Sequence, residues 1–289
     1  MFPVEILLAI ICTSSLSLWL FDKKEIAIVI AISFSFLTFF LNFISYPSLL
    51  LIILFSLSCF FYKNSKKTII RFFLSLLIIF FAALPFSHVI LSSKHITIFD
   101  GIRFSTISAP FWMGINIEKS ICGIILAAFL LKISRSFSEW KTILKEFLPI
   151  YIILTLILLL PAFITGFIKY DFKLPDNMYL FIANNLLLTC LAEEVIFRGF
   201  LQKNIHDILA KTFKMSQAAP LVSITFTSLL FGILHFKSGF LMVIFAFIAG
   251  IGYGYAYQKS WKIETAILVH FGVNITHFIF FTYPFYKVL

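Results

Sequence analysis

A cluster of ionisable residues interrupts one of the most apolar stretches of the chain. The segment from Leu191 to Leu201 holds Glu193, Glu194 and Arg198 among side chains that are otherwise apolar enough to lie inside a lipid bilayer. On insertion scales, each charged residue at the centre of a membrane helix costs roughly 2.5–3.5 kcal/mol. These residues therefore predict a buried polar site in which the charges compensate one another.

The two glutamates of this segment have different neighbours. Glu194 and Arg198 are four residues apart, so on a helix their side chains can meet and neutralise each other. Glu193 points about 100° away around the same helix. One carboxylate is then held in a structural ion pair, while its neighbour is available for chemistry. The alternative is that both carboxylates only hold helices together.

Two further segments place polar side chains in apolar stretches. His235 ends the run from Phe231, which precedes it by one turn on the same face. His270 and Asn274 are also four residues apart, so both face one spot within the last apolar stretch, and His277 continues the same stripe. A lone histidine at a helix end is more often a hydrogen-bonded structural residue than a catalyst. Aligned polar side chains inside a membrane helix require partners, which favours a site.

In this order, the three segments resemble the CPBP family of CAAX proteases and bacteriocin-processing enzymes, also called the Abi family. The type II CAAX prenyl endopeptidase is the best-known eukaryotic relative of that family. The resemblance covers roughly residues 178–281, including the continuation Phe197-Arg-Gly-Phe-Leu-Gln202. It implies an intramembrane endopeptidase of the glutamate type. The motifs that carry it are Glu193-Glu194-x-x-x-Arg198, Phe231-x-x-x-His235 and His270-x-x-x-Asn274.

The resemblance also implies a role for each motif residue. Hydrolysis of a peptide bond requires an activated nucleophile and stabilisation of the oxyanion that forms on attack. In the family mechanism, Glu193 and His235 polarise a water molecule. His270 and Asn274 donate hydrogen bonds to the developing oxyanion, and the neighbouring carboxylate–guanidinium pair keeps the helix in register. The expected substrate is a peptide or protein, lipidated or membrane-anchored.

A zinc hydrolase is the alternative that uses the same residues. Glu193 or Glu194 would then bind the metal together with His235 and His270, and a metal-bound water would be the nucleophile. No His-Glu-x-x-His motif occurs in the chain. Asn274 suits an oxyanion donor better than a zinc ligand. We therefore expect no metal and no other cofactor, with zinc as the alternative.

Two other readings use the polar residues differently. A cysteine protease could be built on Cys190, three residues before Glu193, but nothing in the sequence marks a stabilised thiolate. A transporter or a catalytically silent membrane chaperone would bind with the intramembrane charges rather than cleave. Transport without proteolysis in an uptake assay would identify that class.

The composition excludes an ordinary soluble domain. Of the 289 residues, 61% are hydrophobic and 12% are charged, and the mean hydropathy is +1.04. Soluble domains are usually about 45–50% apolar and about 25% charged. A hydrocarbon core about 30 Å thick needs about 20 apolar residues per helix. Candidate spans of this kind lie near residues 3–21, 26–43, 47–62, 69–91, 115–131, 147–168, 178–202, 218–235, 239–258 and 263–281.

These spans predict an all-α fold, a polytopic transmembrane helix bundle of about 8–10 spans with the catalytic site among the C-terminal helices. A single membrane domain over residues 1–289 is expected, since no linker or repeat divides the chain. Within it, we expect variable N-terminal helices over residues 1–145. The helices over residues 146–289 include the catalytic core, with its motifs within residues 178–281.

The longest polar stretches are expected to connect spans rather than to form them. Residues 92–119 and 132–146 are predicted to be loops or interfacial helices. Gly250 and Gly254 are four residues apart inside a span, a spacing that lets two helix backbones approach closely. We expect this face to pack within the molecule, against the catalytic helices, rather than to form a dimer.

The depth of His235 conflicts with a full-length span before it. If that span begins after Pro220, His235 lies about 22 Å along the helix, whereas Glu193 lies about 15 Å from Lys203 on the cytoplasmic side. The two side chains reach one depth only if the helix before His235 is short, tilted or begins in the interface.

The net charge of +10 reflects membrane topology rather than nucleic-acid binding. The basic residues are scattered through short loops and form no continuous stripe. Fourteen of them fall on one side of the predicted spans and seven on the other, which places both termini outside the cytoplasm.

The four cysteines lie in apolar stretches with no Cys-x-x-Cys pair, so neither a disulfide framework nor a thiolate zinc site is indicated. The expected location is a prokaryotic cytoplasmic membrane, with the lipid bilayer and no nucleic acid as partner.

Overall fold

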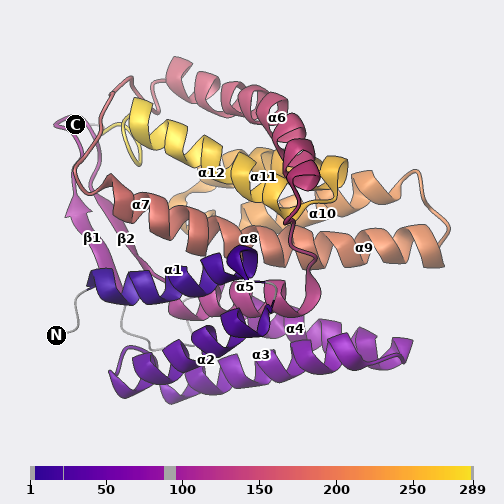
Figure 1. Cartoon of the computed structure of the whole chain (residues 1–289). Coiled ribbons are helices and arrows are strands. Elements are labelled where there is room, and N and C mark those ends of the chain that lie inside the picture. Colours follow the sequence, from indigo (N-terminus) through magenta and orange to yellow (C-terminus); the bar gives the residue numbers. More distant parts are fainter. Residues whose placement is uncertain (1–3, 22, 88–95, 288–289) are drawn as a thin grey trace.

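The computed structural model describes residues 4–21, 23–87 and 96–287, which form a bundle of helices with one short hairpin (Figure 1). Side-chain caps fix several helix starts: Ser45, Asn116 and Ser136 each accept a hydrogen bond from a backbone N–H of the helix that follows. The N-terminal elements are α1 (Val4–Leu20), α2 (Glu25–Phe40), α3 (Tyr46–Asn64), α4 (Thr68–Ser87), β1 (Ile96–Ile102), β2 (Phe111–Ile115) and α5 (Ile117–Leu130).

The C-terminal half contains α6 (Phe137–Ile164) and three helices that follow a long helical segment from Met178 to Thr212. That segment alternates between α-helical and π-helical turns without a break. Its parts are α7 (Met178–Asn184), η1 (Asn185–Cys190), α8 (Leu191–Glu194), η2 (Val195–Gln202), α9 (Lys203–Asp207) and η3 (Ile208–Thr212). The remaining elements are α10 (Ala219–Ile233), η4 (Phe236–Ser238), α11 (Phe240–Ser260) and α12 (Ile263–Phe280).

The prediction of an all-α, polytopic helix bundle is confirmed. Within the described ranges, six helices are long and apolar enough to cross a membrane, and three shorter apolar helices accompany them. The protein is thus an integral, multi-pass membrane protein. The six are Tyr46–Asn64, Thr68–Pro85, Phe137–Ile164, Met178–Thr212, Phe240–Ser260 and Ile263–Phe280, and the three are Val4–Leu20, Glu25–Phe40 and Ala219–Ile233.

Two predicted boundaries are wrong by about ten residues. The span expected over 147–168 begins at Phe137, because Ser136 and Glu139 form a capping box that starts the helix within the 132–146 stretch, which was expected to be loops or interfacial helices. The span expected over 178–202 continues to Thr212, since its polar C-terminal part remains helical.

The stretch expected as loops or interfacial helices over 92–119 is instead largely an antiparallel hairpin. Strands β1 and β2 pair from Ile96 with Ile115 to Ile102 with Phe111. Ile96 and Phe99 are buried, so the hairpin is held by its apolar face rather than by its loop. The end of the span predicted over 69–91 and the start of this stretch, residues 88–95, lie outside the described residues.

Helix α5 lies at the centre of the bundle, between the N-terminal helices and the segment that carries α8 (Figure 1). Nearly all of its residues are buried. A Cβ atom on Gly123 would lie 2.5 Å from Ala192 Cα, so α5 and α8 approach as closely as they do because this position has no side chain. The residues beside Gly123 are thereby brought against the glutamate doublet.

The close approach predicted for the glycine face of α11 is confirmed, and it is intramolecular. A Cβ on Gly250 would lie 3.0 Å from Ser228 Cβ of α10. A Cβ on Gly254 would lie 2.9 Å from Gln202 Oε1. The carbonyl of Gly254 also accepts a hydrogen bond of 3.0 Å from Gln202 Nε2. The glycine face of α11 therefore makes polar contacts as well as close helix packing.

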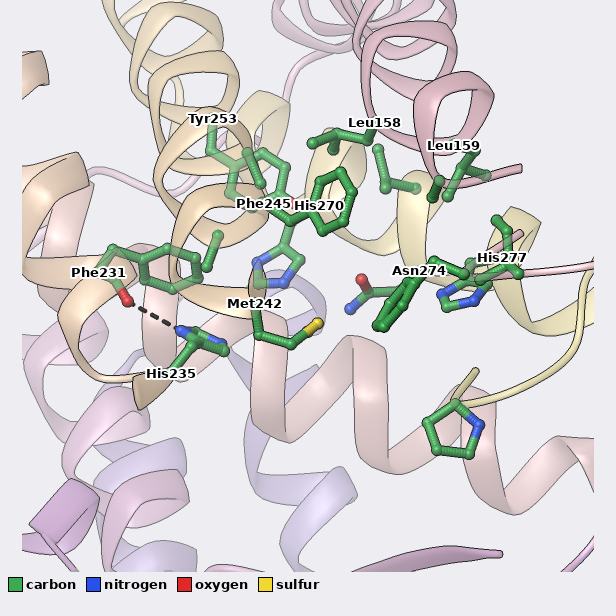
Figure 2. Close-up of a pocket in the computed structure, with 17 residues that line it drawn as sticks. Leu158, Leu159, Phe231, His235, Met242, Phe245, Tyr253, His270, Asn274 and His277 are labelled. Atoms are coloured by element: carbon green, nitrogen blue, oxygen red, sulfur yellow. Dashed lines mark hydrogen bonds between the residues drawn. The ribbon is translucent and has the colours of Figure 1, made fainter. Parts of the chain in front are cut away.

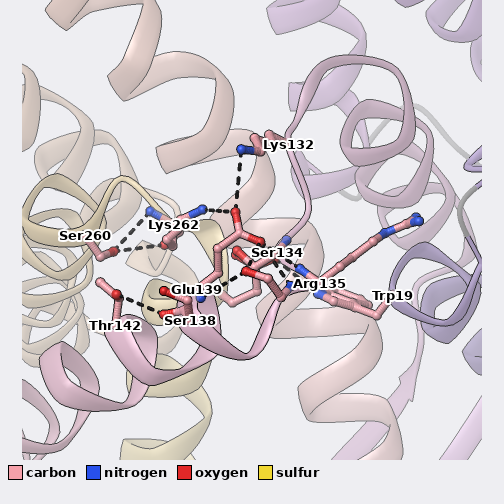
Figure 3. A network of polar contacts seen from close by, with 11 residues as sticks. Trp19, Lys132, Ser134, Arg135, Ser138, Glu139, Thr142, Ser260 and Lys262 are labelled. Carbon is pink, nitrogen blue, oxygen red and sulfur yellow. Dashed lines mark hydrogen bonds and ion pairs between the residues drawn. The ribbon is translucent and has the colours of Figure 1, made fainter.

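A polar network joins α1, the start of α6 and the start of α12 (Figure 3). The buried Glu264 of α12 accepts a 2.7 Å hydrogen bond from Ser134 N and one of 3.2 Å from Trp19 Nε1. Beside it, Glu139 of α6 pairs with Lys262 just before α12. These contacts hold the N-terminal end of α12, the helix that carries His270 and Asn274.

Candidate active site

The glutamate doublet lies on α8, between two π-helical segments. The wider turns of η1 and η2 directly precede and follow Leu191–Glu194. Such turns in membrane and soluble helices often mark functional positions, because they change which side chains share a face. Glu193 is 8% exposed, and Glu194 and Arg198 are completely buried. The burial predicted for these three charged side chains is confirmed.

Glu194 bonds to two side chains from two different helices. Its Oε2 lies 3.2 Å from Arg198 Nε, and its Oε1 lies 3.4 Å from Arg198 Nη1. The same Oε1 lies 2.8 Å from His270 Nδ1 on α12. The contact between positions 194 and 198 follows the four-residue spacing of the sequence, whereas the contact with α12 depends on the fold.

Arg198 finds its remaining partners on α10 and α11. Its Nη2 donates a 3.0 Å hydrogen bond to the carbonyl oxygen of Gly250. The guanidinium carbon lies 4.8 Å from the ring centre of Phe231 and 5.5 Å from that of Tyr253. A planar guanidinium suits such a site, because it can stack on aromatic rings while its N–H groups bond in the plane.

His270 is clamped by aromatic rings as well as by Glu194. The ring of Tyr253 stacks on it with centroids 4.3 Å apart and planes 15° apart. Phe231 meets it edge-on at 6.0 Å. Since Nδ1 donates to the Glu194 carboxylate, Nε2 is the ring atom that is available for chemistry. Tyr253 lies outside all three sequence motifs, and its role in holding His270 was missed by the sequence analysis.

A pocket of about 160 Å³ brings together three of the predicted site residues (Figure 2). His235, His270 and Asn274 line it, although they come from the end of α10 and from α12. His235 bonds through Nδ1 to the carbonyl oxygen of Phe231 at 2.8 Å, which again leaves Nε2 for chemistry. His277 also lines the pocket, but its Nε2 is bonded to the carbonyl oxygen of Thr282 at 3.2 Å.

His235 follows the end of α10 in a turn. Because α10 begins at Ala219 and has 15 residues, the length of this helix leaves His235 about 22 Å along the axis from Pro220. His235 nevertheless lines the same pocket as His270 and Asn274, so helix length alone does not set its depth.

Glu193 is paired with Lys119 of α5, a contact that the motifs do not contain. Lys119 Nζ lies 2.9 Å from Glu193 Oε1, and the two side chains are 13% and 10% exposed. From the sequence, Lys119 is only one of the basic residues that flank spans, because one lysine at the start of an apolar stretch cannot be distinguished from a topological anchor.

Asn274 contacts a second amide that sequence reasoning also missed. Its Nδ2 donates to Asn185 Oδ1 at 3.2 Å and lies 3.8 Å from Cys190 Sγ. The Cys190 thiol itself lies 3.3 Å from the same Asn185 oxygen. In the part of the chain that the structure describes, Cys190 therefore contacts amides and no histidine, which gives a cysteine-protease reading no support.

The donor set fits a metal ion poorly. Among the described residues, no group of three or more His, Cys, Asp or Glu side chains is arranged to hold one. Glu194 and His270, two of the candidate zinc ligands, bond to each other instead. The zinc alternative is left to a direct chemical test.

Comparison with known proteins agrees with this arrangement. The family model described as Type II CAAX prenyl endopeptidase Rce1-like matches residues 175–276. Residues 175–276 are an Rce1-like domain. The predicted resemblance is thereby confirmed, and the domain contains every residue of the three motifs. No curated protein and no solved structure matches the chain. The match supports an intramembrane endopeptidase of the CAAX type, with a peptide or protein substrate in the membrane.

Glu194→Ala and Arg198→Ala should each destabilise the protein as well as inactivate it. Either change leaves a buried charge without its partner, at a cost of roughly 3–5 kcal/mol. The double variant Glu194→Gln/Arg198→Gln should lose less stability than the two single changes added together, because it leaves no unpaired charge. Thermal unfolding in detergent measures all three.

Lys203→Gln is the matched control on the same helical segment. It breaks the partly exposed Lys203–Asp207 pair, whose atoms lie 2.6 Å apart, and should cost less than about 1 kcal/mol. If the Arg198 variant is as stable as this control, the buried pair is not structural.

Proposed function

We propose that the Rce1-like domain hydrolyses its substrate with a water molecule that Glu193 and His235 activate. The observation that carries the proposal is the difference between the two adjacent carboxylates. Glu194 is bound by Arg198 and His270 and is completely buried, so it is committed to structure. Among the described residues, Glu193 pairs with Lys119, and it keeps 8% of its surface exposed.

His235 is oriented to accept a proton. The carbonyl oxygen of Phe231 accepts from Nδ1, so in the neutral ring Nε2 carries the lone pair. A general base needs such an acceptor within reach of the attacking water. Glu193, oriented by Lys119, would share the proton or orient the water.

Asn274 and His270 would stabilise the oxyanion. The Asn274 amide has two N–H groups, and the 3.2 Å bond to Asn185 Oδ1 orients them while using one. His270 donates its Nδ1 proton to Glu194, so Nε2 donates to an oxyanion only when the ring carries both protons. The Glu194 carboxylate faces the imidazolium that this role requires, as a buried carboxylate does in a catalytic triad.

The substrate class to test first is a prenylated peptide with a C-terminal CAAX sequence, which the matched family's description names. The assay reconstitutes the full chain in liposomes and follows release of the C-terminal tripeptide by mass spectrometry. Bacteriocin leaders, sorting-signal tails and membrane-protein segments are the other peptides to include. Cleavage of none of them, together with transport in an uptake assay, would favour the transporter class instead.

Glu193→Gln and His235→Ala should each lower turnover by at least about a hundredfold, because general-base catalysis contributes that much or more. Both variants should unfold near the wild-type temperature, since Gln keeps a hydrogen-bond acceptor for Lys119 and His235 follows the end of its helix. His277→Ala is the matched control, because it lines the same pocket but is bonded to Thr282. Near-wild-type turnover by Glu193→Gln would remove Glu193 as the base.

Lys119→Met should lower turnover by about tenfold or more, because Glu193 loses the ammonium group that lies 2.9 Å from its Oε1 and orients its carboxylate.

Lys119→Arg should restore most of the wild-type turnover, because it keeps the charge. Lys145→Met, which removes an exposed charge from α6, should leave turnover unchanged. A fall in the unfolding temperature of Lys119→Met that accounts for its loss of turnover would make Lys119 merely structural.

Asn274→Asp distinguishes the oxyanion role from a zinc site. A carboxylate repels an oxyanion, so turnover should fall by roughly a hundredfold or more, at least as far as in Asn274→Ala, while substrate binding is nearly unchanged. In a zinc enzyme the new carboxylate could serve as a ligand and retain activity. Metal content and chelator sensitivity are measured on the same preparations. An active aspartate variant with raised metal content would overturn the metal-free mechanism.

A further inference from the structure

A polar pocket of about 350 Å³ lies at one end of the seam between α4 and the long segment that ends at Thr212. Three basic side chains line it: Lys66 and Arg71 from the start of α4 and the turn before it, and Lys211 from η3. Hydroxyl and amide groups, including those of Thr68 and Asn204, add hydrogen-bonding capacity. Basic and hydroxyl groups gathered at a helix end are the chemistry that binds phosphate.

The positive charge of this pocket is not balanced by its acidic group. Asp207, which also lines the pocket, is paired on its own helical segment with Lys203 at 2.6 Å and with Lys211 at 3.6 Å. The Arg71 guanidinium lies 4.6 Å over the ring of Tyr62. Within the described chain, neither Arg71 nor Lys66 forms an ion pair.

A second pocket, of about 290 Å³, continues the same seam toward the middle of the bundle. It lies between α4, η2 and α10, and apolar side chains such as Ile78, Ala83, Phe200 and Leu230 line it. Helix α4 is also the least buried of the six spans, with 17% of its window inside the bundle. A cavity of this kind on a lipid-facing helix accepts hydrocarbon, not water.

Tyr62 connects the two pockets. It lines the polar pocket, and its ring meets Phe200 of the apolar pocket edge-on at 5.6 Å. Its hydroxyl donates a 2.9 Å hydrogen bond to Asn204 Oδ1. Arg71 and Ile78 are seven residues apart on α4, so the basic end and the apolar part of the seam are separated by about 10 Å.

We propose that this seam is a binding site for one anionic phospholipid. The phosphate group lies against Lys66, Arg71 and Lys211, and an acyl chain fills the apolar pocket beside Phe200. An ion such as free phosphate matches only the polar end of the seam, and an uncharged lipid only the apolar part. Lys66 and Lys211 belong to the lysine-rich side of the predicted topology, where anionic lipids are attracted.

The test uses the full chain in nanodiscs of phosphatidylcholine with or without phosphatidylglycerol, and counts retained phosphatidylglycerol by native mass spectrometry. The variant Lys66→Gln/Arg71→Gln should retain about 25-fold less than wild type, because each basic residue near an anionic headgroup contributes about a factor of five. Lys141→Gln/Lys145→Gln, which removes two exposed charges from α6, is the matched control and should retain the wild-type amount. Equal retention by both double variants would overturn the site.

A variant in the apolar pocket tests whether an acyl chain occupies it. Ala83 is exposed in the seam, and Ala83→Trp should displace the acyl chain and reduce retention of phosphatidylglycerol. Leu77→Trp adds an indole to an exposed position of α4 that does not line the pocket and should have no effect. Glycerol 3-phosphate, the headgroup without chains, should raise the unfolding temperature of the wild type far less than phosphatidylglycerol does. Equal protection by the two ligands would mean a phosphate site without a lipid chain.

Discussion

The burial of Arg198 is the constraint on which the rest of the site depends. A guanidinium with no exposed surface is tolerated only if its charge and its N–H groups are satisfied from within the protein. Glu194 supplies the charge from the same helical segment, Gly250 supplies a carbonyl from α11, and Phe231 and Tyr253 supply ring faces from α10 and α11. Because Glu194 also binds His270, a single buried cation places four helices relative to one another.

The two glutamates illustrate how neighbours of identical type acquire different chemistry. Adjacent positions on a helix point about 100° apart, so they meet different helices. Glu194 faces α12 and its own cation, whereas Glu193 faces Lys119 of α5. The Rce1-like domain at residues 175–276 is therefore incomplete by itself in one respect: the cation beside Glu193 comes from the N-terminal part of the chain.

Small residues make these polar contacts possible. In a membrane the hydrophobic effect does not drive helices together, so association depends on close packing and on hydrogen bonds between helices. Gly123 lets α5 touch Ala192, beside the glutamates, and Gly250 and Gly254 let Arg198 and Gln202 reach backbone carbonyls of α11.

The sequence by itself determined the membrane class, the helical fold and the family, because apolar length, the cost of buried charge and the order of the three motifs are local properties of the chain. It also predicted the contact between Glu194 and Arg198 and the packing face at Gly250, since both follow from helical spacing. It misplaced the start of α6 and missed the hairpin at residues 96–115, because caps and short strands depend on a few residues and on the side chains that pack against them.

Only the tertiary structure decided which distant segments of the chain contact the site residues. Lys119 and Glu193 are 74 residues apart, Asn185 and Asn274 are 89 residues apart, and Tyr253 and His270 lie on different helices, so no local spacing encodes these contacts.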